Sequence, residues 1–182
     1  MINLKNIKGF TLIELLATLV ILSIIMLVAI PSTVSVLDKN KKDTYISDAK
    51  RLVALAESEI RNNDKLDVEY NGIIVFPFSE LNDGSFKKDS DSTLYNSKLS
   101  FVVAHKKGTA EDYQFVYYVQ LFGEKRGVPF TTIKSVDRNT VTGVTNTSFD
   151  ISNIENLKTF LAGGKIDGFT STSTNVVYYS SN

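Results

Sequence analysis

The chain has 182 residues, a length that fits one domain, with 20 basic and 20 acidic side chains and no cysteine. The balanced charge gives no support for a nucleic-acid partner, which would favour a basic surplus. The absence of thiols excludes disulfides and thiolate metal sites, and the single histidine, His105, excludes a multi-histidine site. No catalytic nucleophile, base and orienting group can be assembled, so we expect neither an enzyme nor a cofactor.

The charges are unevenly distributed, because residues 1–37 contain only Lys5, Lys8 and Glu14. Residues 10–30 hold 17 apolar side chains in 21 positions. As a helix they would span about 31 Å, roughly the core of a bilayer. The run is too long for an ordinary signal peptide, and the preceding lysines favour a cytoplasmic N-terminus. The sequence therefore predicts a membrane-spanning helix with the body of the protein outside.

Helical spacing continues beyond Pro31, a residue type that ends or bends helices. Apolar side chains recur at steps of three and four as far as Ile60, with charged residues on other faces. We expect one helix from Phe10 to about Asn62, with Pro31 as the place for a bend. Its first part, residues 10–31, is apolar all round, and its second part, residues 32–62, is amphipathic. A plain membrane anchor followed by a linker is the simpler alternative.

Glu14 is the unusual residue of the apolar segment. A carboxylate near the centre of a spanning helix costs about 2.5–3.5 kcal/mol on insertion scales, and less near the interface. No basic side chain follows within two turns, and Lys8 lies six residues earlier, off the same helix face. A positive charge from another chain would satisfy Glu14. The alternative is a glutamate that reaches the membrane surface.

The sequence KGFTLIELL, residues 8–16, resembles the leader region of type IV prepilins and pseudopilins. The resemblance covers about 30 residues: a short basic leader that ends in Gly9, then Phe10, Glu14 five positions into the mature chain, and Pro31. It implies that residues 1–9 are removed by a prepilin peptidase between Gly9 and Phe10, and that the new amine of Phe10 is N-methylated. It also implies a partner for Glu14, the amine of Phe10 in a neighbouring subunit. Pro31 would loosen the helix during assembly.

Residues 63–182 are expected to form a globular head packed on the amphipathic half-helix, giving an α+β pilin fold with an antiparallel sheet. Residues 63–98 form a turn-rich loop around the apolar stretch Ile73–Phe78. Strands are expected at Leu99–Ala104, Tyr113–Phe122, Phe130–Val136 and, at an edge, Asn175–Tyr179. The sequence Ser152-Asn153-Ile154-Glu155 predicts a capped helix that ends at Gly163-Gly164.

Other polar clusters in the head favour structural roles. His105 is expected in a solvated turn at a strand end, beside two lysines. Asp89-Ser90-Asp91 alternates oxygen ligands but lacks the glycine and glutamate of an EF-hand loop, so calcium binding there is the weaker hypothesis. Asn146-Thr147-Ser148 is a formal glycosylation sequon of a kind that often arises by chance, and residues 170–174 predict a polar loop.

The lack of cysteine departs from many type IV pilins, which close the C-terminal loop with a disulfide. We expect packing and strand pairing alone to hold the C-terminal segment, as fits pilins of Gram-positive type. The resemblance implies a structural subunit, a major pilin of a type IV pilus, which waits in the membrane and then enters an extracellular helical fibre for adhesion, twitching motility or aggregation.

The implied partners are further copies of the chain, membrane lipid, prepilin peptidase, the assembly platform with its ATPase, and minor pilins. The alternative is a pseudopilin of a type II secretion or DNA-uptake machine, and only a DNA-uptake pilin would meet nucleic acid. Glu14 and a head of about 120 residues favour the pilin. An anchored enzyme or receptor would leave the leader sequence unexplained.

Overall fold

A computed structural model describes residues 9–64, 66–144, 149, 151, 153–170 and 175–181. The contacts divide the chain into two units, Met1–Asn40 and Lys41–Asn182. The leader lysines Lys5 and Lys8 lie outside the described residues.

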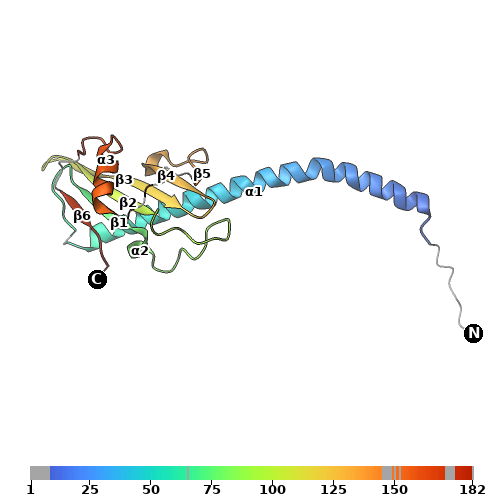
Figure 1. The fold of residues 1–182 in the computed structure, drawn as a ribbon, viewed down its shortest axis with the longest axis horizontal. Coiled ribbons are helices and arrows are strands. Elements are labelled where there is room, and N and C mark those ends of the chain that lie inside the picture. Colours follow the sequence, from blue (N-terminus) through green and yellow to red (C-terminus); the bar gives the residue numbers. More distant parts are fainter. Residues whose placement is uncertain are drawn as a thin grey trace, which may run out of the picture. The chain divides into compact units, whose positions relative to one another are not determined.

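Helix α1, Leu12–Asn62, belongs to both units and confirms the predicted long helix (Figure 1). It begins two residues later than expected and is continuous through Pro31. From Lys41 onward one face of α1 is buried; the buried side chains are those of Tyr45, Ala49, Leu52, Val53 and Ala56. Their spacing of three and four residues explains why this face packs on the sheet while the charged faces remain in solvent.

The second unit contains a six-stranded sheet in the order β5-β4-β3-β2-β1-β6. The strands are β1 (Ile73–Pro77), β2 (Phe101–Gly108), β3 (Tyr113–Phe122), β4 (Arg126–Thr132), β5 (Thr142–Gly143) and β6 (Val176–Tyr178). Two short helical turns, α2 (Phe78–Leu81) and η1 (Ile133–Ser135), follow β1 and β4, and helix α3 (Ile154–Ala162) precedes β6.

The sheet is mixed, whereas the sequence predicted an antiparallel one. Strands β1 to β5 pair antiparallel, but β6 runs parallel to β1, with Ile73 opposite Val176 and Val75 opposite Tyr178. The chain leaves β5 at one edge, passes through α3, and returns at the opposite edge. Such a crossover produces parallel pairing, which a tight hairpin cannot.

Three segments differ in detail from the sequence prediction. The apolar stretch within residues 63–98 forms β1, which lies between β2 and β6. The stretch Phe130–Val136 is divided between the end of β4 and η1. Helix α3 is capped by Asn153, whose side chain accepts a 3.1 Å hydrogen bond from the Asn156 amide. The predicted capping residue Ser152 lies outside the described residues.

His105 is not in a solvated turn. Strand β2 continues to Gly108, so His105 lies inside the strand and is fully buried. The error came from ending the strand at Ala104, where the apolar run stops. Hydrogen bonding in β2 continues into Lys106 and Lys107, which pair with Phe115 and Gln114 of β3.

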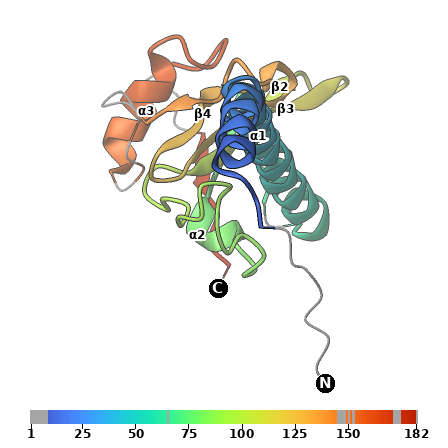
Figure 2. The same ribbon diagram turned by 90° about the vertical axis from the view of Figure 1, so that its right-hand side faces the viewer.

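The sheet separates two apolar layers (Figure 2). One lies between the sheet and α1, where Leu52, Phe76 and Leu121 are fully buried. The other lies on the opposite face beneath α3, where Phe101 meets Leu157 and Leu161. Alternation along each strand directs neighbouring side chains to opposite faces and so supplies both layers.

The loop that contains Asp89 and Asp91 is attached to α1 by polar contacts. Asp91, with only 2% of its side chain exposed, lies 2.8 Å from Lys41 Nζ and 2.7 Å from Arg126 Nε. Asp89 accepts a 2.7 Å hydrogen bond from the Tyr45 hydroxyl and further bonds from Thr93. Because these donors already surround both carboxylates, the pair forms an internal clasp and does not present open oxygens to calcium.

Other polar contacts hold α1 and the C-terminal segment. Arg138 makes a two-bond ion pair with Asp43, with distances of 2.6 and 2.7 Å. At the C-terminus, the Tyr179 hydroxyl donates to Glu59, and Ser181 donates two bonds to Glu80. The C-terminal segment is therefore held by side-chain hydrogen bonds in addition to packing and strand pairing.

We expect Gly123→Ala to destabilise the head, because a Cβ there would overlap Asp89 Oδ2 and the Tyr45 hydroxyl. Overpacking of this kind costs about 1–3 kcal/mol. The matched control is Gly143→Ala, whose Cβ would have its nearest neighbour, the Lys125 carbonyl oxygen, at 3.8 Å. Chemical unfolding of the full chain in detergent micelles measures both, and equal stabilities would contradict the clasp.

Candidate functional site

The start of α1 is organised by Thr11 and Glu14. Thr11 is the residue before the helix, and Glu14 is the third residue in it. The Thr11 amide and hydroxyl donate to Glu14 Oε2 at 2.9 and 2.8 Å, and the Glu14 amide is 3.3 Å from the Thr11 hydroxyl oxygen. These reciprocal bonds form a capping box, which satisfies amides that the first helical turn leaves unpaired.

Glu14 therefore has a partner that our sequence analysis did not name. The spacing Thr11-x-x-Glu14 is itself the capping-box signature and could have identified it. The partner is neutral, however, and both bonds from Thr11 end on the same carboxylate oxygen. The box fixes the side chain and places its charge at the positive end of the helix dipole, but it adds no positive side chain.

Gly9 and Phe10 lie just before this box and are exposed, Phe10 by 82%. A Cβ on Gly9 would have no atom within 4 Å. The junction between the two residues is thus accessible on this chain, a few residues from the Glu14 carboxylate.

The helix that follows presents an apolar surface. Its large side chains from Leu12 to Leu37 are all between 49% and 81% exposed. The hydroxyls of Thr18 and Ser23 donate to backbone carbonyls of the same helix, at 2.8 and 2.7 Å, so they need no outside partner. The segment has the length and hydropathy of a membrane span. Such a surface requires lipid or other protein to cover it.

Pro31 lies inside this segment without ending the helix. Because proline has no N–H, the carbonyl four residues earlier, that of Leu27, lacks its usual helical donor. The hydroxyls of Ser32 and Thr33 both donate to the Ala29 carbonyl at 3.0 Å. The helical ladder is therefore weaker here than in the flanking turns.

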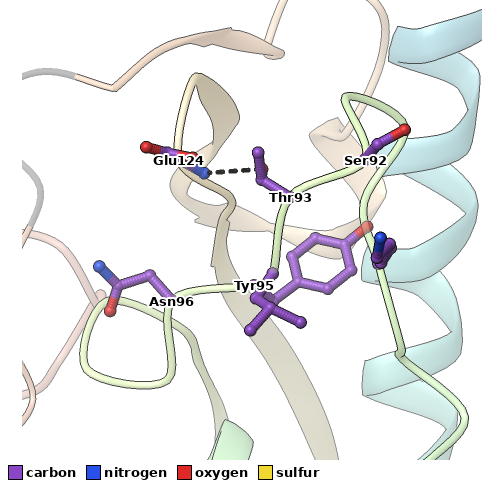
Figure 3. A pocket seen from close by; sticks show the side chains of 7 residues that line it. Ser92, Thr93, Tyr95, Asn96 and Glu124 are labelled. Carbon is purple, nitrogen blue, oxygen red and sulfur yellow. Dashed lines mark hydrogen bonds between the residues drawn. The ribbon is translucent and has the colours of Figure 1, made fainter.

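A surface depression of about 580 Å³ lies beside the attached loop of the head (Figure 3). Two of its hydroxyls are already occupied: Thr93 bonds to Asp89 and accepts a 3.4 Å bond from the Glu124 amide, and the Tyr95 hydroxyl donates to Asp48. These hydroxyls hold the loop in place. Within the described ranges no group of three or more metal-ligating side chains is present. The sequon at Asn146 and residues 171–174 lie outside those ranges.

We expect Thr11→Val, which keeps the shape of the side chain but removes its hydroxyl, to loosen the first turn of α1. Loss of such a cap costs about 0.5–2 kcal/mol, so amide exchange at residues 12–15 should rise about twofold to thirtyfold. NMR of the full chain in micelles measures this, and Thr11→Ser is the control that retains the bond. Equal exchange in the two variants would contradict the capping role.

Comparison with known proteins identifies the N-terminal segment. Residues 4–30 match the model of the prokaryotic N-terminal methylation motif. No curated protein and no solved structure matches the chain significantly. The matched segment contains Gly9, Phe10 and Glu14, the residues at and beside the capping box. This motif is the leader signature of type IV pilins and pseudopilins. It implies processing by a prepilin peptidase and assembly by pilus-type machinery, and with the apolar helix it fits a membrane-anchored precursor.

Proposed function

We propose that the chain is a structural, non-enzymatic subunit of a type IV pilus, which is cleaved between Gly9 and Phe10 and then polymerises into a surface fibre. The observation that carries the proposal is the capped Glu14 at the head of an exposed apolar helix, directly after an accessible Gly-Phe junction. The apolar surface that lipid covers in the precursor would be covered by the same surface of other subunits in the fibre.

The charge of Glu14 supports an assembly role. Thr11 brings no counter-charge to the carboxylate, and cleavage would create a cationic amine on Phe10 of every subunit. In an apolar surrounding an amine and a carboxylate attract far more strongly than in water. The desolvation of both charges offsets much of this gain, so the pair would set the register between subunits and add little net stability. An unpaired carboxylate would in turn oppose burial of the helix.

The head supports display on a fibre. Its loops are fastened to α1 by ion pairs, among them those of Asp91 with Lys41 and of Arg138 with Asp43. Fibres of such subunits would serve adhesion, motility or aggregation. The alternative remains a pseudopilin of a secretion or DNA-uptake machine, since the matched motif is common to both classes.

We expect long surface fibres that an antibody against the head labels along their whole length, as a major pilin requires. Immunogold electron microscopy of producing cells tests this. Labelling at fibre tips alone would indicate a minor pilin, and the absence of fibres would contradict the proposal and favour the pseudopilin. Mass spectrometry of the protein should find Phe10 at the N-terminus with one added methyl group.

The pairing of Glu14 can be separated from its capping role by Glu14→Gln. Glutamine can keep the capping box but carries no charge. We expect fibre yield to fall at least tenfold in Glu14→Gln, as in Glu14→Ala, while the amount of processed protein in the membrane stays unchanged. Fibre counts and N-terminal mass provide the two measurements. Normal fibres from Glu14→Gln would show that the cap, and not the charge, is what assembly needs.

A further inference from the structure

His105 occupies an unusual position in the layer between the sheet and α3. Its neighbours across the ladder are Ile73 of β1 and Val116 of β3. Both belong to the apolar layer beneath α3, and residues opposite each other in a sheet share a face. The imidazole therefore faces α3 and the turns that follow it, on the side of the sheet away from α1.

The imidazole is fully buried, and within the described part of the chain neither ring nitrogen has a hydrogen-bond partner. A buried polar group without a partner costs stability and calls for an explanation. Burial lowers the pKa of His105, the charge of Lys107 lowers it further, and Asp167 partly opposes them. The imidazole is thus neutral in the folded head at neutral pH.

Among the described residues, the groups around His105 do not supply a free counter-charge. Lys107 of β2 and Asp167, in the turns after α3, form a 2.7 Å ion pair with each other. Strands β3 and β6 contribute Tyr118 and Tyr178, whose pKa values are raised by burial, so both are neutral. Gln120 of β3, opposite Phe101, also lies in this layer; it is uncharged, and its amide donates to the Leu99 and Phe149 carbonyls. The apolar side chains from β1, α3 and the turns are Ile73, Val75, Leu157, Leu161, Ile166 and Phe169.

The layer above His105 is formed by α3 and residues 163–170. It is anchored by apolar contacts, with Leu157 and Leu161 fully buried and Ile166 1% exposed. Gly164 and Gly168, with φ of 79° and 80°, stand on either side of Ile166 and Asp167. In contrast to the α1 side, this layer contains no buried ion pair among the described residues.

We propose that His105 is an acid-sensitive latch for this layer: in mild acid, protonation of the imidazole raises the population of a state in which α3 with residues 163–170 is separated from the sheet. A buried imidazolium would need a counter-charge, which Asp167 can give only by leaving Lys107. Separation instead exposes the imidazolium to water. It would also uncover an apolar sheet face that includes Phe101 and Val103. The inference concerns the head alone and does not depend on fibre formation.

The coupling between protonation of His105 and opening of the α3 layer sets the size and direction of the pH dependence. The folded pKa lies below the ordinary value of about 6.5, so the open state binds the proton more readily than the closed state. Stability of the layer is therefore complete above about pH 6.5 and falls as the pH decreases toward the folded pKa. With the closed form neutral, the open fraction at pH 5.5 should be about tenfold that at neutral pH.

The test uses the full chain in detergent micelles, where the single histidine gives one imidazole NMR signal to follow. Between pH 7.5 and 5 we expect the closed-state signal to titrate below its ordinary range. Over the same range, the hydrogen-exchange protection of α3 amides should fall about tenfold by pH 5.5, while amides of α1 after Lys41 remain protected. An imidazole that titrates at its ordinary pKa with α3 protection unchanged would overturn the latch.

The matched variant is His105→Leu, which keeps an apolar side chain of similar length in the same layer. We expect α3 protection in this variant to be independent of pH between 7.5 and 5.5. The same tenfold loss in His105→Leu would assign the acid effect to other groups and overturn the proposal. The wild-type titration decides the question independently if the variant folds poorly.

Discussion

The structure depends on one constraint: a single helix of 51 residues has two different surroundings. From Lys41 onward α1 buries one face against a sheet, but the segment before it buries no large side chain within its own chain. Burial of apolar surface stabilises by about 25 cal/mol for each Å², so leaving the large side chains of this segment in water is costly on the scale of a typical domain's stability, about 5–15 kcal/mol. The apolar surface of this segment must therefore always be covered by lipid or by other chains.

This constraint explains why a carboxylate in the apolar segment is informative. A glutamate in the middle of the span would only impede insertion. Glu14 is instead at the first turn, where unpaired amides and the helix dipole stabilise a negative charge. The capping box with Thr11 fixes this charge within one chain. In the proposed fibre, the amine of a neighbouring subunit would add the counter-charge that Thr11 cannot supply, so the two interactions would complement each other.

The sequence predicted the elements that have a strong local signal. The long helix, β3 and the helix closed by Gly163 follow from periodicity, β-branched and aromatic content, and capping residues. Local patterns did not reveal that β6 pairs parallel to β1, because the crossover through α3 is a long-range property. They also misplaced His105, since a strand that continues through Lys106 and Lys107 contradicts local polarity and is decided by pairing with β3.

At the site, Gly9, Phe10, Glu14 and Pro31 were recognised by resemblance, and the matched motif covers Gly9, Phe10 and Glu14 but ends at Ile30. Thr11 was missed although its spacing from Glu14 is a known pattern. The clasp of Asp89 and Asp91 could not be predicted, because its donors come from Tyr45, Lys41 and Arg126, which are distant in sequence. Acidic pairs of this kind have the same appearance in sequence whether they bind a cation or a side chain.

The α1 side of the sheet is held partly by ionised carboxylates, and the α3 side by apolar contacts around His105. The two sides should therefore lose stability in different pH ranges. On the α1 side, the hydrogen bond from Arg138 lowers the pKa of Asp43; burial raises the pKa of Asp89, but bonds from Thr93 and Tyr45 outweigh it. Carboxylates with depressed pKa values contribute stability that is present above the unfolded value of about 3.9 and lost below it. Protonation of His105 lowers the stability of the α3 layer at higher pH, between about pH 6.5 and the folded pKa of His105. Mild acid therefore weakens the α3 layer while the fastening of α1 remains intact, so a subunit would keep its helix attached to the head while its outer layer changes.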